Sequence, residues 1–245
     1  MSKIIKFTYP RGFTEYLKDV LPVPIKTNIP EWFKKLEHKH SHQTVKGCIP
    51  FLDTLTAGYL IKCPQDIYIN FNIDNPETKE KDTYFQTAVD NPNVTQYLNI
   101  NTSEIQSHST KQLEGSPLVS KNKSCPFFKI LNPFKIITPP GYSILIVPPL
   151  NNSDDRFEII SGIVDTDTYN TEINFPIVLN GDKYDTLETV IDRGAPLAQI
   201  IPFKRDDWKM EVKEEEKKIP YSLVNIQRLI LHNYKKIWWT KKKWN

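Results

Sequence analysis

Three histidines, His38, His40 and His42, alternate along the chain, and on a strand this spacing would place three imidazoles on one face. Imidazole is a good ligand for zinc, nickel or copper, so such a triad could bind a transition metal. The flanking residues are typical of a loop, however. We therefore predict a solvated loop at this position and no metal site.

Four carboxylates that lie near one another in the sequence are a second candidate for chemistry. Hard cations prefer clustered oxygen ligands, and the four residues are Asp154, Asp155, Asp165 and Asp167. No glycine-centred calcium loop accompanies them, so we expect these side chains to stabilise turns. Here too the sequence predicts no bound metal ion.

The C-terminal residues interleave basic and aromatic side chains. Such a segment could follow a phosphate backbone while its rings stack on bases, which makes nucleic acid one candidate partner. Three tryptophans so close together are costly to leave in water, and tryptophan often anchors protein interfaces. We therefore favour docking of this tail on another protein chain rather than on its own chain. The residues predicted to bind the partner are Trp238, Trp239, Trp244, Lys241, Lys242 and Lys243.

The composition limits the class of protein. The chain has 245 residues and a formal net charge of +3, so no strong overall field selects nucleic acid or membrane. It contains 19 prolines and 8 glycines, which suit short strands and stiff connections and exclude a long-helix protein. No apolar stretch is long enough to span a membrane, and the first ten residues lack a signal-peptide pattern. We expect a soluble protein made in the cytoplasm, with Cys48, Cys63 and Cys125 as buried reduced thiols.

Short strands are expected to position the candidate residues. Apolar and polar residues alternate in several stretches, and turns rich in Pro, Gly and Asn separate these stretches. Many short strands at such spacing are typical of a sandwich or barrel, so we predict a mainly β fold. The predicted strands cover residues 59–61, 66–71, 134–138, 142–147, 157–164, 172–179, 188–191 and 198–202.

The chain is predicted to have three parts. Residues 1–55 form an irregular N-terminal segment with short helices within 12–21, 30–36 and 44–55. Residues 56–207 form a β-rich core that carries a polar insertion at about 74–125. Residues 208–245 comprise a charged linker, a helix over 222–236 and the basic-aromatic arm.

Several motifs occur in an order that points to a known fold. The sequence Ala57-Gly58-Tyr59-Leu60 is followed by a Pro-Pro-Gly turn and strand at 139–147, the hairpin 162–165 (Gly-Ile-Val-Asp), and the strand 194–200 with its Ala-Gln pair. This arrangement resembles the β-rich core of the dUTPase and dCTP deaminase superfamily. The resemblance implies a β-clip or barrel core with a C-terminal helical arm.

The resemblance also implies roles for three residues. Asp165 matches the carboxylate that activates water for attack on a nucleotide α-phosphate, and Tyr169 matches the residue that packs on the deoxyribose. Gln199, in the later strand, is the third candidate for nucleotide binding. A carboxylate acts as a general base only if water and the electrophile are held beside it, and phosphoryl chemistry also needs cations or N–H donors, usually with magnesium.

The chain departs from the family pattern where those donors are expected. The position of the family's R-S-G turn is occupied by residues 148–151 (Pro-Pro-Leu-Asn), and Leu60 stands where the first motif has an Asp. The glycine-rich arm of the family is replaced by a tail rich in Trp and Lys. We therefore expect Asp165 to cap the hairpin rather than to catalyse.

Over its whole length the chain is similar to an uncharacterised protein family of tailed phages, large viruses and some bacteria. This similarity implies a viral or phage source. The chain has 27 lysines and only 5 arginines, a ratio that also suits an AT-rich genome. The residues that carry the similarity are 30–34, 44–53, 56–59, 132–134, 138–143 and 202–205.

These observations favour a non-catalytic viral or phage structural or protein-interaction module without a cofactor, in the host cytoplasm or the virion. The partner is expected to be a sibling subunit in a homo-oligomer, with a trimer as the form implied by the resemblance, or a second viral protein. The alternative is a nucleotide-binding protein or nucleotide hydrolase of the dUTPase or dCTP deaminase type, which would need magnesium. We predict that strands flanked by Gly162 and Gly194 direct into the core Ile163, Ile173, Phe175, Ile177, Leu197 and Ile200.

Overall fold

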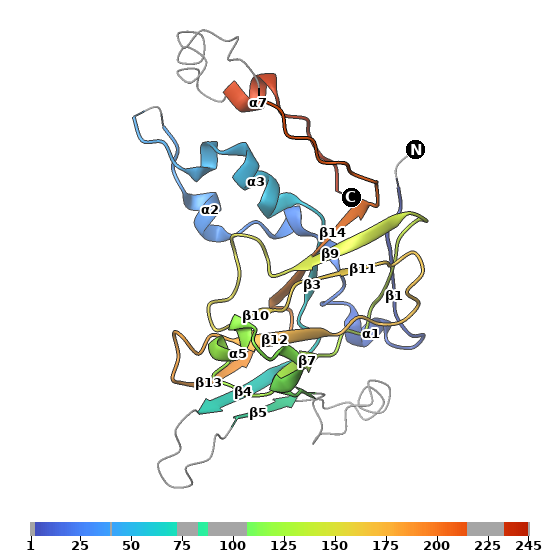
Figure 1. Ribbon diagram of the computed structural model, residues 1–245, viewed down its shortest axis with the longest axis vertical. Helices are drawn as coiled ribbons and strands as arrows, with labels where there is room; N and C mark the ends of the chain where they lie inside the picture. The colour runs from blue at the N-terminus through green and yellow to red at the C-terminus, as the bar shows by residue number, and fades with distance from the viewer. Residues whose placement is uncertain (1–2, 40, 73–82, 88–106, 215–232, 245) are drawn as a thin grey trace.

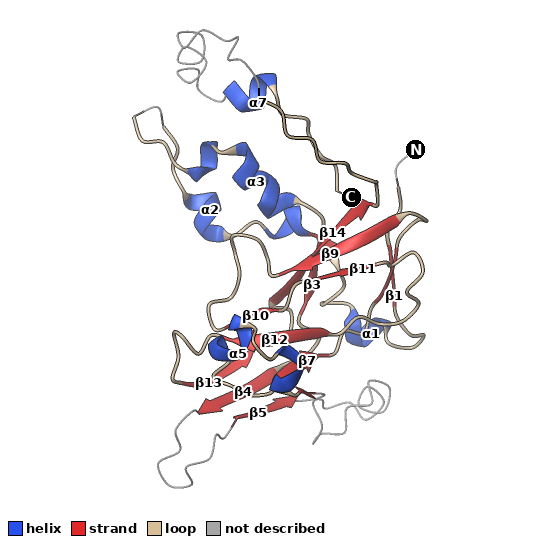
Figure 2. Cartoon of the chain, in the orientation of Figure 1, coloured by secondary structure: helices blue, strands red, loops and turns tan. Residues whose placement is uncertain are grey.

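The computed structural model describes residues 3–39, 41–72, 83–87, 107–214 and 233–244, and the following statements concern those residues. Antiparallel strands dominate and the helices are short, as Figure 2 shows, so the prediction of a mainly β fold is confirmed. The strands are β1 (Lys6–Thr8), β2 (Val23–Pro24), β3 (Tyr59–Lys62), β4 (Ile67–Asn72), β5 (Thr83–Thr87), β6 (Ser107–His108), β7 (Phe127–Ile130), β8 (Lys135–Ile137), β9 (Tyr142–Val147), β10 (Phe157–Ile159), β11 (Gly162–Val164), β12 (Phe175–Leu179), β13 (Thr186–Ile191) and β14 (Pro196–Lys204).

The sheet that positions the candidate residues has five strands in the order β11-β9-β14-β3-β2. Its longest pairing joins β9 and β14 antiparallel, from Gln199 opposite Val147 to Lys204 opposite Tyr142. The other sheets have the orders β10-β12-β7-β6, β13-β4-β5 and β1-β8. Most strands carry β-branched residues on the inward face, because such side chains pack well on a pleated surface.

One hydrophobic core joins the sheets. It contains five of the six residues predicted to point inward, namely Ile173, Phe175, Ile177, Leu197 and Ile200. The prediction for Ile163 is wrong, because its side chain is 65% exposed. Ile163 and Val164 both belong to β11, which is an edge strand. Val164, the residue after Ile163, packs against the core. Successive side chains of a strand point to opposite faces, so Ile163 must face outward.

Short helices precede the core, near the positions predicted for them. They are α1 (Thr14–Leu17), η1 (Ile25–Asn28), α2 (Glu31–Lys35), η2 (Val45–Gly47) and α3 (Ile49–Thr56). Proline lies at the start of α3, where its missing N–H costs nothing. Figure 1 shows α2 and α3 near each other and far from β4 and β5. We call α2, α3 and the residues between them the collar.

Gly58 fixes the distance between the collar and the five-stranded sheet. It connects α3 to β3 with a φ of +74°, a conformation that side chains rarely adopt. A Cβ atom here would lie 2.0 Å from the carbonyl oxygen of Ile200 in β14. The glycine in the Ala-Gly-Tyr-Leu motif therefore permits α3 to lie directly against the sheet.

The remaining helices lie outside the collar. They are η3 (Thr110–Leu113), α5 (Pro117–Lys121) and α7 (Asn233–Ile237). The first two, with β5 and β6, are the described parts of the predicted insertion at 74–125. Most of the helix predicted over 222–236 lies outside the described residues. No helix in the described ranges has the length and apolar character that crossing a bilayer requires.

Candidate functional site

Asp165, the candidate catalytic carboxylate, directly follows β11 and contacts two neighbouring polar side chains. The Ser143 hydroxyl donates a hydrogen bond of 2.6 Å to Asp165 Oδ1. The guanidinium of Arg205 donates to Ser143 Oγ at 2.9 Å and lies 3.3 Å from the same carboxylate oxygen. Asp165 keeps a side-chain exposure of 57%. The carboxylate thus links β9, β11 and the end of β14.

Arg205 also pairs with Asp167. Its two terminal nitrogens donate to the two Asp167 oxygens at 2.9 and 2.5 Å, the bidentate geometry that makes such pairs strong. The Gly141 N–H adds a third hydrogen bond at 2.8 Å. The bonds from Arg205, followed by that from Gly141, lower the pKa of Asp167 to about 2. This network holds the chain at the point where it leaves β14.

The other two predicted nucleotide-binding residues lie in different environments. Tyr169 is exposed, and its backbone N–H donates to the Asp165 carbonyl oxygen at 2.9 Å in a turn. Gln199 is fully buried in β14. Its amide nitrogen donates to the carbonyl oxygens of Thr54 and Ala57 at 2.9 and 2.7 Å, and its oxygen accepts from Leu150 N at 2.9 Å. Gln199 therefore connects β14 to α3 and to the turn after β9.

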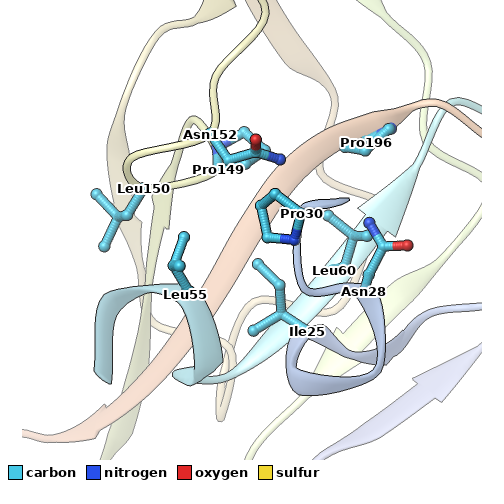
Figure 3. A pocket seen from close by; sticks show the side chains of 9 residues that line it. All are labelled: Ile25, Asn28, Pro30, Leu55, Leu60, Pro149, Leu150, Asn152 and Pro196. Atoms are coloured by element: carbon cyan, nitrogen blue, oxygen red, sulfur yellow. The ribbon is translucent and has the colours of Figure 1, made fainter. Parts of the chain in front are cut away.

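That turn occupies the position that the resemblance assigns to phosphate binding, and two of its side chains are hydrogen-bonded to the collar. Asn151 Nδ2 donates to Thr54 Oγ1 in α3 at 2.7 Å. Asn152 Oδ1 accepts from Trp32 Nε1 in α2 at 3.2 Å. A small pocket of about 10 Å³, room for one water molecule, lies beside the turn, between η1, the end of α3, β3 and the start of β14. Figure 3 shows that mostly apolar side chains line it: Ile25, Asn28, Pro30, Leu55, Leu60, Pro149, Leu150, Asn152 and Pro196.

Of the three histidines predicted to lie in a loop, His38 and His42 are described, and both lie outside helices and named strands. His38 Nδ1 accepts from the Thr44 N–H at 3.0 Å, and its ring lies where a Cβ on Gly47 would be. His42 pairs with Lys39 through the backbone in an isolated bridge, and His40 lies outside the described residues. Within the described ranges no three His, Cys, Asp or Glu side chains form a group suited to a metal ion.

The described arm, residues 233–244, contacts its own chain at α3 and β3. Trp239 Nε1 donates to both carboxylate oxygens of Asp53, at 3.1 and 3.0 Å. Lys242 Nζ donates to Asp53 Oδ2 at 2.6 Å and also lies 5.8 Å from the centre of the Trp239 ring. Trp244 meets Tyr59 edge-to-face, with ring centres 6.3 Å apart. The expectation that the arm does not fold back is therefore wrong for Trp239 and Trp244, because a carboxylate and an aromatic ring of the same chain satisfy them.

The rest of the arm is exposed to solvent. Trp238 retains 65% exposure, and Lys241 and Lys243 are also exposed. Tyr234 and Ile237 of α7 are exposed as well. These side chains lie at i, i+3 and i+4 positions with Trp238, so they can form one apolar face of the short helix.

A second exposed element lies where the sequence predicts only a charged linker, at the start of the segment 208–245. Residues 206–214, here called the strap, continue from β14 in extended conformation without assignment to any sheet. Trp208, Met210 and Val212 are 91%, 86% and 84% exposed. Their spacing of two, with charged residues between them, is the signal of a half-buried strand. Figure 1 shows this segment leaving the end of β14 toward α7.

Comparison with known proteins finds similarity in structure alone. No protein-family model matches the chain, and no curated protein matches it. Among solved structures, the dUTPase of Staphylococcus bacteriophage 80alpha, with dUpNHpp, is 17% identical; the match covers 39% of this chain and 70% of that one, with a TM-score of 0.28. The dUTPase from phage phi11 of S. aureus is 16% identical, over 38% of this chain and 75% of that one, also with a TM-score of 0.28. Both matches cover less than half of this chain.

Proposed function

We propose that the chain is a non-catalytic protein-interaction module, a viral or phage structural component that docks on a partner through the strap. The observation that carries this proposal is the near-complete exposure of Trp208, Met210 and Val212 on one face of an extended segment. An extended peptide can add to the edge of a sheet, where its backbone supplies hydrogen bonds and alternate side chains enter pockets. The strap has the backbone and the side-chain spacing for this mode.

The exposed apolar area is large enough for a specific interface. The strap side chains are joined on the arm by Tyr234, Ile237 and Trp238. Three of the six, Trp208, Tyr234 and Trp238, are aromatic; if each contributes up to about 150–250 Å² when covered, these three offer at most about 450–750 Å², to which Met210, Val212 and Ile237 add. One partner's share of a standard interface is about 800 Å². Single exposed apolar residues are normal, but six large ones gathered on two short segments favour an interaction role for these segments.

We favour a second copy of this chain as the partner. The strap contains the carboxylates of Asp206, Asp207, Glu211 and Glu214 and two lysines, whereas the whole chain has a formal net charge of +3. The strap is therefore negatively charged and the rest of the chain is positively charged. Electrostatics favours contact between the strap and the remainder of a second copy. Among the described residues β11 is an edge strand of its sheet and Ile163 is exposed on it, so this edge is a suitable acceptor for an added strand.

The environment of Asp165 supports a non-catalytic role. Its carboxylate is engaged by Ser143 and Arg205, and Asn151 and Asn152 in the turn at 149–152 are hydrogen-bonded to the collar. Stabilising the charge that develops on a phosphate requires preorganised cations or N–H donors aimed at it. At that turn the Leu150 N–H is directed to Gln199 instead.

The test is the molar mass of the chain measured by size exclusion with light scattering. Trp208→Ser combined with Met210→Ser should convert an oligomer to a monomer without lowering the melting temperature of the core. Tyr68→Ser, at an exposed aromatic residue of β4, is the matched control and should leave the mass unchanged. A wild-type chain that is monomeric at every concentration contradicts the proposal of a homo-oligomer, and magnesium-dependent dUTP or dCTP hydrolysis abolished by Asp165→Asn contradicts the non-catalytic role.

A further inference from the structure

The arm, residues 233–244, has an anchored side and an exposed side. Trp239, Lys242 and Trp244 contact α3 or β3 of the same chain and anchor the arm there. Lys241 and Lys243, which stand between these anchors in the sequence, are exposed to solvent. Because the anchors hold the extended part of the arm near both of its ends, a ligand does not have to order this segment in order to bind it. The exposed side of the arm is therefore a preorganised surface.

This surface concentrates positive charge. Residues 233–245 contain five lysines and no carboxylate, and removing these five charges from the formal net charge of +3 leaves −2 for the rest of the chain. Lys242 is paired with Asp53. A local positive charge of this density attracts a polyanion even though the net charge of the chain is small. The four lysines of the arm that form no ion pair with the described part of the chain are Lys235, Lys236, Lys241 and Lys243.

Two exposed aromatic rings lie beside these lysines. Tyr234 and Trp238 are both exposed. The Trp238 N–H donates to the Tyr234 carbonyl oxygen at 3.0 Å, and residues four apart in such a helical turn direct their side chains to the same face. Figure 1 shows α7 at the end of the molecule remote from β4 and β5. Rings and cations are thus interleaved at one exposed end of the chain.

We infer that Tyr234, Trp238 and these four lysines form a binding site for single-stranded nucleic acid. Lysine ammonium groups neutralise backbone phosphates, while exposed rings stack on bases. Only a single strand uses both groups, because the faces of the bases are covered in a duplex. Stacking tolerates every base and lysine meets phosphate as a point charge, so we expect no sequence preference. This inference goes beyond the proposed protein docking, which rests on the strap.

The number of lysines sets the salt dependence of binding. For a single strand, the logarithm of the binding constant falls by about 0.7 per neutralised phosphate for each unit of the logarithm of salt concentration. Four lysines give a slope of about −2.8, so raising the salt from about 50 to about 200 mM should weaken binding about 50-fold. The strap, with four carboxylates and two lysines, repels phosphate, so the strand should follow the arm and not the strap.

The experiment measures binding of a fluorescein-labelled oligothymidylate of about 12 nucleotides to the full chain by anisotropy, at several salt concentrations. Trp238→Ala should weaken binding by about 5- to 140-fold, the range for loss of one stacked base, without changing the salt slope. Lys241→Gln combined with Lys243→Gln should reduce the magnitude of the slope by about 1.4. All three side chains are exposed, so the variants should keep the melting temperature of the wild type.

Matched controls separate this site from charge and exposed rings elsewhere. Trp208→Ala, at the exposed tryptophan of the strap, should leave the affinity unchanged. Lys6→Gln combined with Lys111→Gln, at exposed lysines of β1 and η3, should leave the slope unchanged. No binding at 50 mM salt, equal weakening by Trp208→Ala and Trp238→Ala, or a duplex of the same length bound as tightly as the single strand overturns the inference.

Two outcomes distinguish this inference from the proposed protein docking. If Trp238→Ala lowers the molar mass measured by light scattering but not the affinity for the oligonucleotide, the rings of the arm belong to a protein interface and the inference fails. If the oligonucleotide binds as expected while the wild-type chain is monomeric, the nucleic-acid site stands and the proposed homo-oligomer fails.

Discussion

Gln199 offers the sharpest test of how the collar is held to the sheet. Its buried amide joins β14 to the carbonyl oxygens of Thr54 and Ala57 and to the N–H of Leu150. Gln199→Met removes these three hydrogen bonds but keeps an unbranched side chain of similar length. Each buried group left without a partner costs about 1–3 kcal/mol. Because Thr54 and Ala57 are only partly buried, we expect a total loss near the lower end, about 3 kcal/mol.

The assay is thermal or urea unfolding of the two proteins. For a chain of this size, 1 kcal/mol corresponds to about 2–4 °C, so Gln199→Met should lower the melting temperature by about 6–12 °C. Gln199→Glu should lower it further, because a carboxylate would face two carbonyl oxygens without a donor. Gln43→Met, at an exposed glutamine, is the control and should change stability by less than about 0.5 kcal/mol.

The result also separates a structural role from nucleotide binding. If Gln199 acts as this bridge, the loss of stability is the same with and without a nucleotide and magnesium. A melting temperature of Gln199→Met within about 2 °C of the wild type, less than the shift expected for 1 kcal/mol, would refute the reasoning.

Three other predictions follow from the described contacts. Leu197→Ala, in the core, should cost about 2–5 kcal/mol in chemical unfolding; a cost below about 1 kcal/mol would mean that the site collapses or is not packed as described. The folded-state pKa of Asp167, about 2, lies below the ordinary 3.8, so its contribution to stability is present above about pH 4 and is lost as the pH falls toward 2. Asp167→Asn should remove that part of the acid dependence measured by pH-dependent unfolding. The prediction of a buried thiol is wrong for Cys48, which is exposed, whereas burial raises the pKa of Cys63 to about 12. A thiol reagent should therefore label Cys48 rapidly in the native chain and Cys63 only after unfolding; rapid native labelling of Cys63 would contradict its burial.

The strands could be predicted from sequence because their signals are local. The predicted strand 142–147 coincides with β9, and the predicted strand at 198–202 lies within β14. Alternation alone, however, does not tell which face of an edge strand is buried. Ile163 was therefore assigned to the core, although pairing with β9 turns its side chain to solvent.

The candidate site was harder to predict because it depends on contacts between distant residues. The tryptophans of the arm were recognised as docking residues from composition, but their partner, Asp53, lies 186 residues before Trp239. Apart from its unfavourable place in the last turn of α3, no local pattern predicts that Asp53 binds the arm. The strap did carry a local signal, since Trp208, Met210 and Val212 alternate with charged residues. The many charged residues around these three side chains are also typical of a solvated linker, so this alternation was not interpreted as a strand signal.

The helix α3 contacts both the arm and the turn at 149–152. Thr54 of this helix accepts from Asn151 of the turn, while the adjacent Asp53 accepts from Trp239 and Lys242 of the arm. The same helix end is held to β14 by Gln199. The arm therefore adds contacts to the same helix that contacts the turn at 149–152, and these contacts should stabilise the collar as well as the arm.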